Sequence, residues 1–293
     1  MKMFNIPNLF TASNMLCGVF AIILAFAGRI DIAPYFIFLA AVLDFFDGFL
    51  ARLFKQQGEL GKQLDSLADM ISFGLAPGIM MLVILISQTT FVDPESLFFG
   101  HGEYIATAYK TEHLHPSVFG PEALNMSLHI WRNSLYEWKN INGLPFVGLI
   151  IPFFSMFRLA KFNIDTRQSE SFIGLPTPAN TIFFMAFPLL LAKYGETSGW
   201  EHNLIVYLVQ PVILIPVIVV MSLLLIAELP LFALKFKNFK WKGNEVRYIF
   251  LISCGILIST LLVWSIPIIV LLYLLLSFIQ HILRKNRTHE IQS

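Results

Sequence analysis

The sequence predicts an all-α membrane protein with about eight transmembrane helices. Hydrophobic residues make up 56% of its 293 positions and charged residues only 13%, whereas a soluble domain carries about 25% charged residues. The apolar residues also form long continuous runs, and a membrane-spanning helix needs roughly 20 of them. This composition excludes a soluble globular enzyme, a disordered chain and a secreted disulfide scaffold, and the runs do not alternate as the strands of a β-barrel would.

Each predicted helix is an apolar run of about the length of one span, with ends placed to within about three residues. In chain order the runs are 9–28, 33–53, 64–86, 145–162, 177–194, 204–227, 246–263 and 265–283. Trp264, Ser265 and Pro267 separate the last two runs. This short break predicts a tight helical hairpin at the C-terminal end.

The distribution of basic residues predicts the orientation of these spans. With the N-terminus inside, fifteen of the 20 Lys and Arg residues fall in segments on the inner side and five on the outer side. Basic residues are enriched in cytoplasmic loops. We therefore expect an integral multi-pass protein of the cell inner membrane, with both termini in the cytoplasm.

One connection, 87–143, is much longer than the others and lies outside in this topology. It carries several acidic residues, and the stretch 128–131, which ends in Trp131, is typical of a helix lying at the membrane interface. The segment could serve as a functional lid. The interpretation we favour is an insertion that rests on the membrane surface.

Four carboxylates interrupt the second and third apolar runs. Asp44 and Asp47 are three residues apart, and Asp65 and Asp69 are four apart, so each pair lies on one face of its helix. The short link between the two helices makes them antiparallel neighbours, which brings both pairs close together near the cytoplasmic ends. Ionisable residues inside a membrane are costly and are functional candidates by default.

These carboxylates predict a metal site. Four of them so close cannot all stay ionised without a compensating cation, and hard oxygen ligands without His or Cys favour Mg²⁺ or Mn²⁺. The small residues Gly48, Ala51 and Gly61 either let two helices approach closely or leave room for a flat nucleotide base. Arg52 either contacts a phosphate or anchors a helix end at the membrane surface.

Two classes of function suit such a cluster. One is a proton or cation relay in a transporter, and the other is metal-assisted phosphoryl chemistry. The glycines and the phosphate-suited Arg52 favour the second class.

The pattern D-x-x-D-G-x-x-A-R-x8-G-x3-D-x3-D resembles the signature of the CDP-alcohol phosphatidyltransferase family. Its eight fixed positions are filled by Asp44, Asp47, Gly48, Ala51, Arg52, Gly61, Asp65 and Asp69. The resemblance implies an integral membrane enzyme with a six-helix core, usually a homodimer, with a divalent metal site and a CDP-linked lipid donor. On this basis we expect a membrane domain over 1–227, with the insertion 87–143, followed by a basic loop and helical hairpin over 228–293.

The resemblance also implies roles for individual residues. Asp44, Asp47 and Asp65 would bind the metal, and Asp69 would complete or border the metal site and act as the general base. The CDP group would be held by Asp47, Gly48, Ala51, Arg52 and Gly61.

The flanking segments 7–14, 64–77, 158–163 and 172–179 resemble the phosphatidylserine synthase branch of the family. This resemblance implies that the enzyme transfers a phosphatidyl group from CDP-diacylglycerol to L-serine and releases CMP. Glycerol 3-phosphate or inositol phosphate is the alternative acceptor within the family. We expect no nucleic-acid partner.

Two further sets of polar residues are candidates for substrate contacts. A serine pocket needs a cation and polar acceptors, and Arg158, Lys161 and Asn163 lie together at the cytoplasmic end of the fourth run. Anchoring at the membrane surface is the alternative for these residues. Thr11 and Asn14 share one face of the first helix, where they line the nucleotide pocket or serve helix packing.

Overall fold

The computed structural model describes residues 5–56, 58–90, 121–138, 141–165, 172–232, 240–241 and 243–292. Helices occupy each of the eight predicted apolar runs, which confirms the all-α polytopic membrane class. Among the described residues, four helical stretches are long and apolar enough to cross a membrane, or five if one bent pair is a single span. This number is lower than the eight spans expected from the sequence, so the count of eight stays a prediction.

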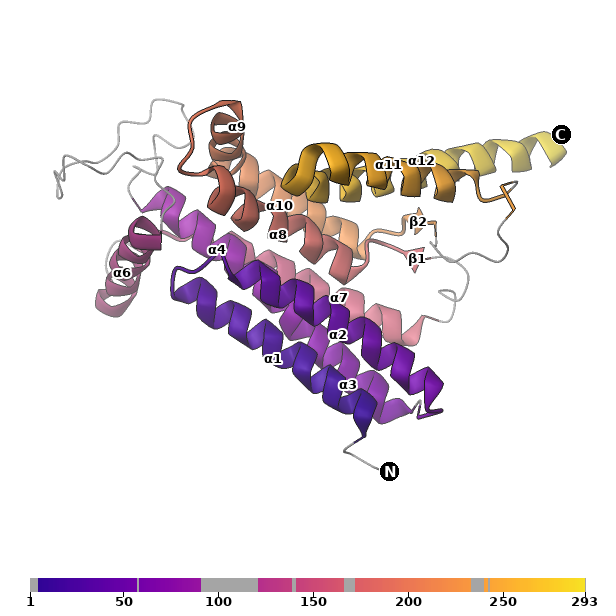
Figure 1. Ribbon diagram of the computed structural model, residues 1–293, viewed down its shortest axis with the longest axis horizontal. Coiled ribbons are helices and arrows are strands. Elements are labelled where there is room, and N and C mark those ends of the chain that lie inside the picture. Colours follow the sequence, from indigo (N-terminus) through magenta and orange to yellow (C-terminus); the bar gives the residue numbers. More distant parts are fainter. Residues whose placement is uncertain are drawn as a thin grey trace.

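Figure 1 shows the helices and strands in chain order. The helices are α1 (Ile6–Phe26), α2 (Ala33–Leu53), α3 (Glu59–Asp69), the π-helix η1 (Met70–Leu75), α4 (Ala76–Thr89), α6 (Pro121–Glu137), the 3₁₀ helix η2 (Leu144–Leu149), α7 (Ile150–Ile164), α8 (Thr177–Tyr194), α9 (Trp200–Leu208), α10 (Pro211–Ile226), α11 (Glu245–Leu261), the 3₁₀ helix η4 (Leu262–Trp264) and α12 (Ser265–Gln292). The strands β1 (Phe172–Ile173) and β2 (Pro230–Leu231) pair antiparallel, with Phe172 opposite Leu231.

Helix α1 packs lengthwise on α2 and also touches α3 (Figure 1). It begins with a capped turn, because the Asn5 side chain accepts a hydrogen bond from the Asn8 amide at 2.8 Å and Pro7 lies in the first turn. The interior of the bundle is filled by α4, whose residues from Met80 to Ile86 are almost completely buried. The third span is therefore central, and it carries two of the four carboxylates.

A π-helical turn interrupts this third span immediately after Asp69. Side chains of two other helices hold it: Ser72 Oγ donates to the Asn14 carbonyl of α1 at 3.0 Å, and Thr181 Oγ1 of α8 donates to the Phe73 carbonyl at 2.6 Å. A π-helical turn changes the direction in which the following side chains point. Its position thus separates the carboxylate-bearing turns from the apolar part of the span.

The last two helices fold back on each other, as the sequence predicts. The chain reverses at Leu262, which has a φ of 49°, and the rings of Phe250 and Tyr273 then lie 5.8 Å apart across the pair. One of the four apolar stretches, 245–282, is this pair of helices. Tyr273 also donates a hydrogen bond to the Phe232 carbonyl at 2.9 Å, which ties the hairpin to the segment after β2.

The described part of the long connection contains the predicted helix, α6. Leu124 and Leu128 are buried, and the rings of Trp131 and Phe146 lie 5.8 Å apart. Helix α6 therefore packs on the bundle near the start of the η2–α7 span. Residues 91–120 lie outside the described residues, and the placement of the insertion on a membrane surface stays a prediction.

Candidate active site

The structure brings the four carboxylates of α2 and α3 together. One oxygen from each of Asp44, Asp47 and Asp65 lies within 4.8 Å of the others. Asp69 lies outside this group of three, one helical turn after Asp65 on α3. The spacing of three and four residues therefore does place both pairs on faces that meet.

Polar side chains of α1 hold two of these carboxylates. Thr11 Oγ1 donates to Asp47 Oδ2 at 2.6 Å, and Asn14 Nδ2 donates to Asp69 Oδ1 at 3.3 Å. All four residues are buried. Thr11 and Asn14 thus orient the acids directly, in addition to any packing role, and a lining role toward a nucleotide stays a prediction.

The four carboxylates lie close together without an ion-pair partner among the described residues. Within the ranges that the structure describes, none of the four carboxylates forms an ion pair with a basic side chain; the ion pairs are Arg29–Asp31 and Lys161–Glu228. Buried carboxylates without a counter-ion favour a bound cation. Because the donors are all oxygens, the residues fit a hard divalent ion.

The two glycines of the motif, Gly48 and Gly61, border open space instead of a helix contact. A Cβ atom added at Gly48 would meet no atom within 4 Å, and one at Gly61 would meet only Asn8 Oδ1, at 3.6 Å. Helix packing therefore does not explain these two glycines. Arg52 is exposed in the last turn of α2, where its guanidinium can reach a ligand beside the carboxylates.

Gly18 and Gly48 form a contrasting pair for mutation. A Cβ atom at Gly18 would lie 2.7 Å from the Cα atom of Ser72, so we expect Gly18→Ala to lower the free energy of unfolding by about 1–3 kcal/mol, the cost of overpacking. Gly48→Ala should leave stability unchanged or raise it by up to about 1 kcal/mol, because alanine favours helix. Thermal unfolding of both variants in detergent checks this expectation. Equal destabilisation by both would contradict it.

The three residues predicted for a serine pocket have different surroundings. Arg158 is 3% exposed; its Nε donates to the Leu175 carbonyl at 3.2 Å, while its Nη1 is buried without a hydrogen bond among the described residues. Lys161 forms an ion pair with Glu228 at 3.1 Å. Asn163 Nδ2 donates to Ser66 Oγ at 2.7 Å, and the Asn163 carbonyl accepts from Lys62 Nζ at 2.6 Å. The structure thus ties Asn163 to α3 and leaves Arg158 with a free donor.

Sequence reasoning missed several buried polar side chains near this region. Ser155, Asn180 and Ser222 are each fully buried, and each has a side-chain atom without a hydrogen bond to any described residue. All three lie inside apolar runs, and a polar residue in such a run is the signal that also identified the aspartates. The signal is weaker for these three, because polar uncharged residues are common in membrane helices.

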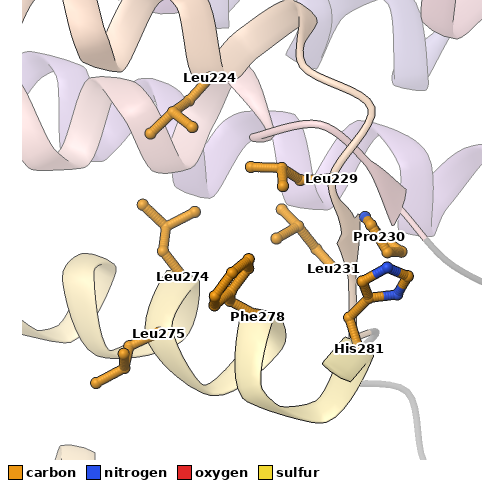
Figure 2. A pocket seen from close by; sticks show the side chains of 8 residues that line it. All are labelled: Leu224, Leu229, Pro230, Leu231, Leu274, Leu275, Phe278 and His281. Atoms are coloured by element: carbon orange, nitrogen blue, oxygen red, sulfur yellow. The ribbon is translucent and has the colours of Figure 1, made fainter. Parts of the chain in front are cut away.

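A separate apolar cavity of about 400 Å³ lies between the end of α10, β2 and α12 (Figure 2). Leu224, Leu274 and Phe278 contribute to its wall, and His281 is the one ionisable lining residue. No residue of the carboxylate cluster lines it. Its lining suits a hydrocarbon chain and not a phosphate or an amino acid.

Comparison with known proteins finds relatives that are named as serine O-phosphatidyltransferases, and one named as an archaetidylserine synthase. The chain is 29% identical over 196 residues to the CDP-diacylglycerol–serine O-phosphatidyltransferase of Bacillus subtilis, covering 64% of this chain and 80% of that one. It is 34% identical to the enzyme of that name from Mycobacterium tuberculosis, over 67% of this chain and 54% of that one. It is 25% identical to the archaetidylserine synthase of Methanothermobacter thermautotrophicus, over 66% of this chain and 61% of that one. The matches to the second and third relatives thus span less than two thirds of their length.

The profile of the CDP-alcohol phosphatidyltransferase family matches residues 4–94. This range contains the whole carboxylate motif together with Thr11 and Asn14 of α1. The resemblance predicted from the sequence, to the family and to its serine branch, is therefore confirmed. Over residues 4–94 the chain therefore matches the CDP-alcohol phosphatidyltransferase family.

Proposed function

We propose that the protein transfers the phosphatidyl group of CDP-diacylglycerol to the hydroxyl of L-serine, releasing phosphatidylserine and CMP. The observation that carries this proposal is the complete carboxylate motif: oxygens of Asp44, Asp47 and Asp65 lie within 4.8 Å of one another, and two glycines of the motif border open space. The relatives from Bacillus subtilis and Mycobacterium tuberculosis are both named for transfer to serine, which supports serine as the acceptor.

A divalent cation, Mg²⁺ or Mn²⁺, belongs to this proposal. Asp44, Asp47 and Asp65 would hold it, with Asp69 at its border, because three carboxylates this close supply the hard oxygen donors that such ions need. When bound, the cation would neutralise the negative charge on the pyrophosphate oxygens.

The chain's own residues provide the proton transfer. Asn14 holds Asp69 through one carboxylate oxygen, so that the carboxylate keeps a fixed direction. Asp69 accepts the proton of the serine hydroxyl as the serine oxygen bonds to the lipid-side phosphorus. The bond between that phosphorus and the bridging oxygen breaks, and the electron pair leaves with CMP.

The substrates bind on either side of the carboxylates in this proposal. Gly48, Ala51, Arg52 and Gly61 receive the cytidine diphosphate, since both glycines leave space and Arg52 carries an exposed guanidinium. Arg158 offers its unbonded Nη1 to the serine carboxylate. Lys161 and Asn163, which hold Glu228 and Ser66, shape the rim of this pocket.

The proposal places the active site at the cytoplasmic face of the cell inner membrane. The four carboxylates lie in the second half of α2 and the first turns of the third span, and the distribution of basic residues assigns these ends to the inner side. Serine and the CTP-derived head group are available there, while the acyl chains remain in the bilayer. The proposal also includes a homodimeric enzyme whose N- and C-termini both lie in the cytoplasm.

An acceptor assay tests the proposal. Purified protein with CDP-diacylglycerol and Mg²⁺ or Mn²⁺ should release CMP when L-serine is added, and at least about tenfold more slowly with water alone. Release only with glycerol 3-phosphate or inositol phosphate would assign another acceptor of the same family. Cation flux into sealed vesicles without CMP release would favour a transporter, in which the four acids form a relay.

A further inference from the structure

Several buried polar atoms of α7 and α8 have no hydrogen-bond partner among the described residues. Asn180 is fully buried, and neither atom of its amide is bonded. Ser155 Oγ and Arg158 Nη1 on α7 share this state. Buried polar groups in folded proteins are almost always paired, with protein, water or a ligand. These atoms therefore indicate a place that something polar occupies.

Two of the residues with unbonded groups, Arg158 and Asn180, are tied to the beginning of α8. Arg158 reaches that point through its bond to the Leu175 carbonyl, two residues before the first residue of α8. Asn180 lies in the first turn of α8, and side chains on a helix lean toward its N-terminus. Its amide therefore leans toward the segment that Arg158 contacts.

The start of α8 also lies next to the third span, which carries Asp69. A Cβ atom at Gly74 would lie 3.2 Å from Ser155 Cβ, and Thr181, next to Asn180, donates to the Phe73 carbonyl. Both contacts fall on η1, about one turn along the span from Asp69. A molecule held at the start of α8 would thus lie beside the π-helical turn that follows Asp69.

The start of α8 also suits an anion. This helix has 18 residues, and no side chain of the described residues caps its first turn. Uncapped amide groups at a helix N-terminus attract carboxylates, and an arginine beside them adds charged hydrogen bonds. The helix amides and the Arg158 guanidinium can only donate hydrogen bonds. Asn180 adds a side-chain carbonyl oxygen, which can accept a hydrogen bond from a cation.

We propose that Asn180 is a specificity-determining residue for the acceptor and recognises the zwitterionic head of a hydroxy-amino acid. Arg158 and the first turn of α8 take the carboxylate, and the Asn180 amide oxygen accepts from the ammonium group. This inference rests on the proposed function and deepens it, because it separates the recognition of the ammonium group from that of the carboxylate.

The experiment compares wild-type protein with Asn180→Leu, a change that keeps side-chain size and removes the amide. Initial rates of CMP release give kcat and KM for L-serine, and competition against serine gives the inhibition constant of 3-hydroxypropanoate, which lacks the ammonium group. We expect the KM for serine to rise about tenfold to a hundredfold, the effect of losing a hydrogen bond to a charged group. The inhibition constant of 3-hydroxypropanoate and the KM for CDP-diacylglycerol should change less than threefold.

Asn203→Leu makes the same chemical change on the exposed surface of α9 and should leave every constant unchanged. If Asn180→Leu does not fold, Asn180→Ala is measured in the same way. Equal weakening of serine and 3-hydroxypropanoate, or no change in either, would overturn the inference and indicate water or packing at this site. Wild-type protein that releases no CMP with serine would instead overturn the proposed function, and this inference with it.

Discussion

Asp69→Asn is expected to reduce turnover by about 10²–10⁴-fold, the range that a general base contributes. The amide has nearly the shape of the carboxylate but cannot accept the proton of the acceptor hydroxyl. Asn14 bonds one oxygen of Asp69 at 3.3 Å, and the amide oxygen of the variant can keep that bond. The loss should therefore appear in kcat, while the KM for CDP-diacylglycerol changes by less than about threefold.

Asp31→Asn is the matched control for this variant. Asp31 lies in the turn between α1 and α2, and the hydrogen bonds and charge of Arg29 lower the pKa of its carboxyl, so the change removes a real charge far along the helices from the cluster. We expect its turnover to stay within about twofold of wild type. Wild-type turnover by Asp69→Asn would exclude Asp69 as the base. A loss of CMP binding in that variant would place Asp69 among the metal ligands.

The sequence predicted the parts of the site that depend on helical periodicity. Asp44 and Asp47 share one face, as do Asp65 and Asp69, because side chains three or four residues apart are neighbours on any helix. The short link between α2 and α3 then requires the two helices to be adjacent and antiparallel. The turn at Trp264 followed similarly from a short break between two apolar runs.

Features that depend on contacts between distant helices could not be predicted in this way. The π-helical turn depends on Ser72 and Thr181 bonding across to α1 and α8, and nothing in the local sequence specifies those partners. Lys161 and Asn163 were grouped with Arg158 by spacing, yet Glu228 and Ser66 occupy their polar atoms. The run 204–227 was predicted as one helix, whereas α9 and α10 meet at a 64° bend before Pro211.

Removal of divalent cations is expected to abolish activity, and added Mg²⁺ or Mn²⁺ should restore it. The physical reason is the group of Asp44, Asp47 and Asp65, whose charges no basic side chain balances among the described residues. Titration of Mn²⁺ into metal-free protein, followed by electron paramagnetic resonance, measures binding without activity. Full turnover in excess chelator would contradict the metal role.

Substitution of Thr11 tests whether α1 contributes to the cation affinity of the carboxylate site. The Thr11 hydroxyl donates to Asp47 Oδ2 at 2.6 Å, and loss of such a supporting bond typically weakens metal binding by about 10–100-fold. We expect Thr11→Val, which keeps the shape of the side chain, to weaken Mn²⁺ binding by at least about tenfold. Ser13→Ala is its control, since the hydrogen bond that the structure gives Ser13 Oγ is to the Leu9 carbonyl of its own helix, away from the carboxylates. Unchanged Mn²⁺ affinity in Thr11→Val would mean that α2 and α3 position the carboxylates without help from α1.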